Sequence, residues 1–114
     1  MEQEYVVERD RLIYPMPKEV DHHETIRMQA ELDMLIQRHQ IRRLILDFEQ
    51  TEFMDSSGIG IIIGRARTVH FYGGKVYAIH LSGRSKKIFQ AAGLQNIIQI
   101  LEEVNYEKSY ADEL

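Results

Sequence analysis

Apolar residues recur along this chain with two different periods, and each change of period marks a new segment. Short apolar runs are typical of strands, whereas apolar residues at i, i+3, i+4 and i+7 are typical of helices. The pattern predicts strands at residues 5–7, 12–14, 44–48, 75–81 and 97–101. It predicts helices at residues 21–39, 57–72, 82–92 and 102–114, the last of them acidic and weakly amphipathic.

Capping residues and helix breakers agree with these boundaries. Asp21 and Ser82 are residue types that cap helix N-termini with a side-chain oxygen. The pair Gly73-Gly74 stops the second helix, and Gly93 is well placed just after the third. Each helix is therefore bounded by residues whose backbone or side chain suits that boundary.

The predicted elements follow one another in the order ββαβαβαβα with short connections. This order indicates an α/β fold, with a mixed sheet of four to five strands and about four helices. Pro15 and Pro17 lack a backbone N–H, which confines them to a sheet edge or beyond it. With 114 residues, of which 44% are hydrophobic, the chain suits one compact domain, expected over residues 3–113.

Charge and composition exclude several classes of function. The net charge is −4 and the basic residues are scattered, so we expect no nucleic-acid partner. The longest apolar stretch, residues 59–63, is too short to span a bilayer, and the N-terminus lacks the features of a signal peptide. Cysteine is absent, which excludes disulfides and thiolate chemistry. These features predict a cytoplasmic protein without a membrane partner.

The most informative stretch is residues 53–60, Phe-Met-Asp-Ser-Ser-Gly-Ile-Gly, which joins a buried strand to a helix. A helix N-terminus has unpaired N–H groups and the positive end of the helix dipole. It accommodates a capping hydroxyl or a phosphate. Ser56 is therefore either a helix cap alone or also a phosphorylation site.

The helix that follows carries two glycines, Gly60 and Gly64, one turn apart on one face. Each glycine costs a helix roughly 1 kcal/mol, so something is expected to approach the backbone closely there. Two interpretations remain open: the glycines pack against the sheet or a neighbouring helix, or they form a flat docking strip for another protein. Ile61 lies off the apolar stripe beside them, which favours a contact surface.

Enzymatic and cofactor motifs are incomplete. The glycines at 58, 60 and 64 do not match a dinucleotide fingerprint, which needs a glycine at 63, and no cofactor is expected. Ser56 has Met54 instead of the first glycine of a nucleophile elbow. An aspartyl-phosphate receiver domain needs a pair of acidic residues after its first strand to hold magnesium, and the run Leu12-Ile13-Tyr14-Pro15 offers none. His22 and His23 are adjacent, which on a helix points them in different directions and argues against metal binding. We expect no enzymatic activity and no metal.

Several motifs together resemble the STAS domain of sporulation-type anti-sigma factor antagonists. They are the Asp21-His22-His23 start, residues 41–48, the Asp-Ser-Ser-Gly element within residues 53–60, Gly64-Arg65, and Phe-Gln-Ala-Ala-Gly-Leu at 89–94. The similarity covers nearly the whole chain. The chain departs from the family pattern at Lys18, where a glycine is usual, and at Pro15 and Pro17.

The resemblance implies a regulatory binding protein with Ser56 as phosphoacceptor. The unmodified antagonist would bind an anti-sigma factor that is also a serine kinase, freeing the sigma factor, and a serine phosphatase would reverse the phosphorylation. Asp55, Ser57 and Gly58 would support the phosphosite. The partner would be contacted by Asp21, His22, Gly60, Ile61, Gly64 and Arg65. The alternative function is a STAS scaffold subunit of a larger sensory assembly.

Overall fold

A computed structural model describes residues 4–102 of the chain. Its main sheet has five strands in the order β1-β2-β4-β6-β7. These strands are β1 (Val6–Glu8), β2 (Arg11–Pro15), β4 (Arg43–Asp47), β6 (Lys75–Ile79) and β7 (Gln99–Ile100). The β1–β2 pair is antiparallel and the other pairs are parallel, so the sheet is mixed as predicted.

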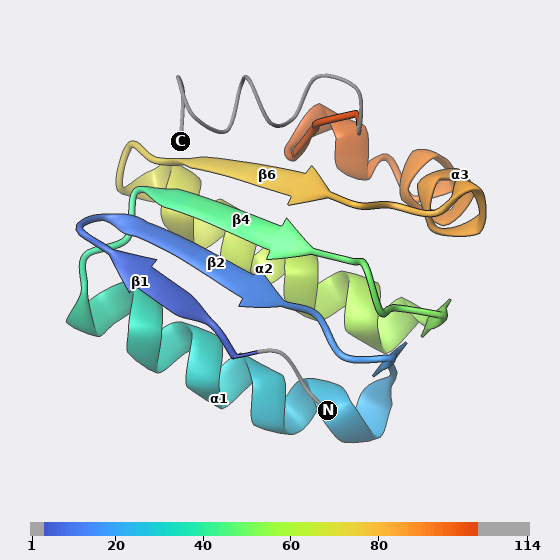
Figure 1. The fold of residues 1–114 in the computed structure, drawn as a ribbon, viewed down its shortest axis with the longest axis horizontal. Helices are drawn as coiled ribbons and strands as arrows, with labels where there is room; N and C mark the ends of the chain where they lie inside the picture. Colours follow the sequence, from blue (N-terminus) through green and yellow to red (C-terminus); the bar gives the residue numbers. More distant parts are fainter. Residues whose placement is uncertain (1–3, 103–114) are drawn as a thin grey trace.

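Three helices connect the parallel strands. They are α1 (His22–Arg38), α2 (Ser56–Phe71) and α3 (Gly83–Ala91), followed by a short 3-10 helix at Leu94–Asn96. Figure 1 shows α1 and α2 side by side on one face of the sheet, with α3 beyond the end of β6. The predicted terminal helix at 102–114 lies outside the described residues, apart from its first residue. None of the helices in residues 4–102 combines the length and hydropathy needed to cross a bilayer.

The predicted helix ends are confirmed at most positions. Asp21 and Ser82 cap α1 and α3, accepting N–H groups of Glu24 at 2.9 Å and Ser85 at 3.1 Å. Gly73 and Gly93, just beyond α2 and α3, have φ values of +83° and +75°, a left-handed conformation that glycine adopts without steric cost. The sequence therefore places these boundaries to within a residue or two.

Two very short strands are not predicted by the sequence pattern. These strands, β3 (Glu19–Val20) and β5 (Phe53–Met54), pair with each other in parallel, Glu19 opposite Phe53 and Val20 opposite Met54. Each leads directly into a helix, β3 into α1 and β5 into α2. Because the pair is parallel and in register, it sets the N-termini of α1 and α2 next to each other.

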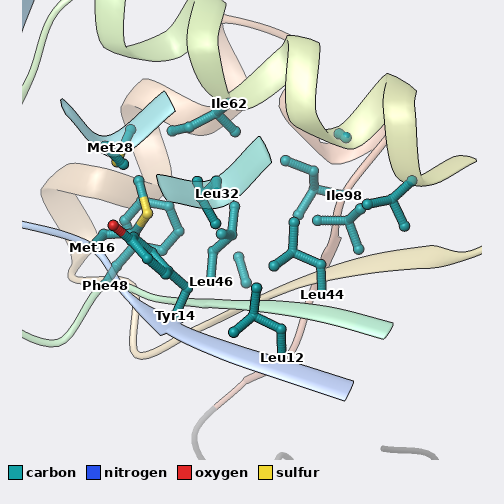
Figure 2. Packing of buried hydrophobic residues seen from close by; sticks show 14 of the residues in the cluster. Leu12, Tyr14, Met16, Met28, Leu32, Leu44, Leu46, Phe48, Ile62 and Ile98 are labelled. Carbon is teal, nitrogen blue, oxygen red and sulfur yellow. The ribbon is translucent and has the colours of Figure 1, made fainter. Parts of the chain in front are cut away.

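The main core fills the space between the sheet and its two covering helices. Figure 2 shows Met28 and Leu32 of α1 facing Leu44, Leu46 and Phe48. These five side chains are at most 2% exposed. On the opposite face of the sheet a smaller cluster contains Ile45, Tyr77, Ile79 and Leu101. The alternation of Leu44, Ile45 and Leu46 between the clusters follows from the two-residue period of a strand.

Pro15 ends an inner strand rather than an edge strand. Its neighbour Met16 donates its N–H to the carbonyl of Asp47, the last residue of β4, while pairing with β1 stops at Ile13. The missing N–H of Pro15 thus falls where the β1 side of the strand has no further ladder partner, which is the condition that proline requires.

Candidate functional site

Ser56 is the first residue of α2, and the helix cap is its neighbour Asp55. Asp55 has extended backbone (φ −111°, ψ −179°), and its Oδ1 accepts the N–H of Gly58 at 2.9 Å. The interpretation of Ser56 as the cap is therefore wrong, because a serine inside the first turn cannot fill that position. Ser56 and Ser57 are both exposed, and among the described residues nothing hydrogen-bonds the Ser56 hydroxyl.

Gly58 is required by a close approach of the chain. A Cβ atom at this position would lie 2.1 Å from the carbonyl oxygen of Val20 and 2.6 Å from its Cγ1. The same carbonyl accepts the N–H of Asp55 at 3.1 Å. Val20 therefore fixes both the cap residue and the third residue of α2, which holds Ser56 in place between them.

The N-terminus of α1 lies beside that of α2. Asp21 follows Val20 in β3, and Asp55 follows Met54 in β5, so the parallel register puts the two cap residues at equivalent positions. His22 is the first residue of α1 and is exposed, as Ser56 is on α2. The structure thus brings Asp21 and His22 to the same edge of the molecule as the predicted phosphosite.

Gly60 and Gly64 have open space around them. No described atom lies within 4 Å of the position that a Cβ atom would take on either glycine, apart from their own helical surroundings. Packing against the sheet or against α1 therefore does not explain them, which removes one of the two interpretations. The other interpretation, a docking strip, stays a prediction.

Two residues of the predicted contact strip are less exposed than expected. Ile61 is half-buried and packs against the main core. The side chain of Arg65 is only 13% exposed, with its Nε 2.8 Å from Oδ1 of Asp33 on α1. Nε and Nη1 of Arg65 are buried without a hydrogen-bond partner among the described residues. Arg65 thus joins α1 to α2 more than it faces solvent.

One cluster of polar side chains, at the carboxyl ends of β4 and β6, is not predicted by the sequence pattern. His80, which follows β6, lies with its Nδ1 2.8 Å from Oδ1 of Asp47 and 3.9 Å from Oε2 of Glu49. The histidines are scattered along the sequence, and His80 is 33 residues from Asp47, so only the parallel register of β4 and β6 brings these two together. No local signal in the sequence reveals this contact.

The fold and the Asp-Ser-Ser-Gly helix start define a STAS domain: the model of that family matches residues 3–107, and the chain belongs to the family. Among curated relatives, an anti-sigma F factor antagonist from Paenibacillus polymyxa is 33% identical over 98 residues, covering 85% of this chain and 84% of the relative.

Two solved structures share the fold over nearly all of both chains. The anti-sigma factor antagonist SpoIIAA in its unphosphorylated form superposes with a TM-score of 0.79 at 26% identity, covering 97% of this chain and 96% of the other. The Bacillus cell fate determinant SpoIIAA in its phosphorylated form gives 0.74 at 27% identity, covering 97% and 98%. These relatives include both states of a phosphorylated regulator.

Proposed function

We propose that the protein is an anti-sigma factor antagonist whose binding is switched by phosphorylation of Ser56. The unphosphorylated form binds an anti-sigma factor that is also a serine kinase, and this releases the sigma factor. Phosphorylation by that kinase ends the complex, and a serine phosphatase restores it. The antagonist itself is not an enzyme and acts in the cytoplasm.

The proposal rests on the observation that the cap of α2 and the hydroxyl of Ser56 belong to different residues. Asp55 caps α2, so the exposed hydroxyl of Ser56 has no structural task among the described residues. A kinase can therefore modify it without breaking the helix start. Relatives named as antagonists of anti-sigma factors, one of them solved in a phosphorylated form, support this use of the position.

The electrostatics of the site explain how a phosphate would act. A phosphoserine carries roughly 1.5 to 2 negative charges, which the positive end of a helix dipole tolerates. Asp55, adjacent to it, adds like charge, and a bound partner would have to desolvate both groups. The phosphate should thus weaken binding far more than it changes folding.

The surface beside Ser56 suits the docking of a partner. Gly60 and Gly64 leave the outer face of α2 open, and Asp21 and His22 border it from α1. Ile61 and Arg65 would contribute mainly by holding α2 in place, since both residues are partly buried. A side chain of the partner could thus approach the α2 backbone closely.

Phosphorylation by the cognate kinase tests the proposal directly. Incubation of the protein with this kinase and ATP should add one phosphate, which peptide mass mapping should locate on Ser56. The Ser57→Ala variant is the matched control, because it removes the neighbouring exposed hydroxyl and should still accept one phosphate. A phosphate on Ser57, or none with a kinase that is demonstrably active, contradicts the proposal.

A further inference from the structure

A histidine and two carboxylates converge where the central strands β4 and β6 end. Asp47 is the last residue of β4, Glu49 lies two residues beyond it, and His80 is the first residue after β6. One ligand-type atom from each of these side chains lies within 4.8 Å of the others. Open α/β sheets commonly bind ligands just outside the carboxyl ends of their strands, which is where this cluster lies.

The spacing of these atoms is close to that around a small divalent ion. Zinc binds imidazole nitrogen and carboxylate oxygen at roughly 2.0 to 2.2 Å, which places two tetrahedral ligands roughly 3.3 to 3.6 Å apart. Nδ1 of His80 lies 2.8 Å from Oδ1 of Asp47, which is shorter than this separation, and 3.9 Å from Oε2 of Glu49, which is longer. Small side-chain rotations would bring all three atoms to one ion.

A backbone hydrogen bond and burial hold the Asp47 carboxylate in position. Oδ1 of Asp47 also accepts the N–H of Glu49 at 3.0 Å, and the Asp47 carboxylate is 11% exposed. Glu49 is 60% exposed and is therefore the ligand with room to move. A hollow of about 280 Å³ beside them is lined by Glu49, His80 and Lys86 among others, and Glu102 pairs with Lys86. This hollow gives access to an ion and to a water molecule as its fourth ligand.

We propose that Asp47, Glu49 and His80 form a binding site for one Zn²⁺ ion. The mixed nitrogen and oxygen ligands favour zinc over Mg²⁺, which prefers oxygen alone. A bound ion would connect the segment that leads from β4 into β5 and Asp55 with the segment that leads from β6 into α3. This proposal does not depend on the phosphorylation switch, so a test of one leaves the other unaffected.

Isothermal titration calorimetry of the 114-residue chain with Zn²⁺ tests the site. The wild type should bind one Zn²⁺ per chain, and Mg²⁺ at the same concentration should give no saturable binding. His80→Asn should lower the zinc affinity at least tenfold. Asparagine tolerates the φ of +60° at this position, so this variant should keep the fold. Glu49→Gln, at an exposed position, should lower the affinity similarly.

His39→Asn is the matched control, because His39 is exposed and lies before the start of β4, whereas Asp47 is at the end of that strand. It should bind zinc as the wild type does. The proposal is overturned if the wild type shows no saturable binding, or if zinc affinity survives in both His80→Asn and Glu49→Gln. Equal loss in His39→Asn would also overturn it, since that result indicates binding to surface histidines in general. Circular dichroism of each variant confirms that the fold is retained.

Discussion

The helices α1 and α2 begin in the same way. Each follows a two-residue strand, β3 or β5, and each is capped by an aspartate with nearly the same backbone angles. In each, the aspartate accepts the N–H of the third helical residue at 2.9 Å. Asp21 and Asp55 therefore solve the same problem, the unpaired N–H groups of a helix start, at two adjacent places.

The two helix starts differ in the residues after the cap. The first helical residue is His22 in α1 and Ser56 in α2, and the third is Glu24 in α1 and Gly58 in α2. Five and nine residues after the cap, α1 has Ile26 and Ala30, where α2 has glycines. Because α1 is capped without a serine or a glycine, the needs of a helix start do not explain why α2 has Ser56 and three glycines. Gly58 has one within the chain, and Ser56, Gly60 and Gly64 have none among the described residues.

The largest effect on stability is expected at Gly58. Gly58→Ala should lower the free energy of unfolding by about 2 to 3 kcal/mol, because its Cβ would collide with the Val20 backbone, which cannot rotate away. Gly60→Ala, two residues on, meets open space and should raise it by about 0.5 to 1 kcal/mol. Urea denaturation of both variants measures the difference. Equal effects would show that the two glycines have the same role.

The next effect concerns affinity and sharpens the role of Gly64. Gly64→Gln should weaken anti-sigma factor binding by at least about 1 to 2 kcal/mol, typical of a disturbed interface centre, while improving helix propensity. Stability and affinity should thus move in opposite directions. Gly64→Gln separates binding from folding better than Ile61→Glu would. Ile61 packs against the core, so a glutamate at that position would also disturb folding.

Ala30→Gln is the control for Gly64→Gln. Ala30 lies nine residues after the cap of α1, as Gly64 does after the cap of α2, and it is exposed. We expect wild-type affinity in this variant. Calorimetric binding titrations compare the two. An equal loss of affinity in both would mean that the docking surface is not confined to α2.

The two cap residues should contribute equally to the free energy of unfolding. Asp21→Ala and Asp55→Ala should each lower the free energy of unfolding by about 1 kcal/mol, since each removes one side-chain hydrogen bond to a helix N–H. Chemical denaturation should therefore give similar losses for the two variants. A much larger loss for Asp55 alone would show that the two helix starts are not equivalent.

Much of this fold follows from sequence periodicity, and the site follows from it less completely. The segments around Leu44 to Phe48 and Met28 to Ile36 are long enough to show their period, and the structure confirms both predictions. The strands β3 and β5 have two residues each, too few for any alternation, so their pairing cannot be predicted from periodicity. That pairing decides which residue caps α2.

The choice of cap could not be read from local residue types. Asp55, Ser56 and Ser57 are all good N-cap residues, and only the contact of β5 with Val20 selects Asp55. The half-burial of Ile61 and Arg65 likewise depends on how closely α1 packs, which helical periodicity does not encode. The sequence therefore indicates a candidate site around Ser56, but it does not show which residue caps the helix or which side chains are buried.

The smallest expected change in stability, and the sharpest test of the switch, is at Ser56. Ser56→Ala should change the free energy of unfolding by less than about 0.5 kcal/mol, because Asp55 provides the cap. Partner binding should persist and become insensitive to ATP. Ser56→Asp places a carboxylate at the positive end of the helix, so it should be as stable as the Ala variant or slightly more so. It should nevertheless bind the anti-sigma factor at least about tenfold more weakly, by about 1.4 kcal/mol or more, through charge repulsion and desolvation.

His22→Asp is the matched control for charge, because His22 holds the same position on α1 as Ser56 does on α2. It adds an equal charge at the same edge of the molecule and should weaken binding less than Ser56→Asp. Thermal melts beside binding isotherms of the three variants separate the explanations. If affinity instead followed stability across them, Ser56 would be a structural residue of α2. Equal losses in the two aspartate variants would indicate a general effect of acidic charge, with no special place for Ser56.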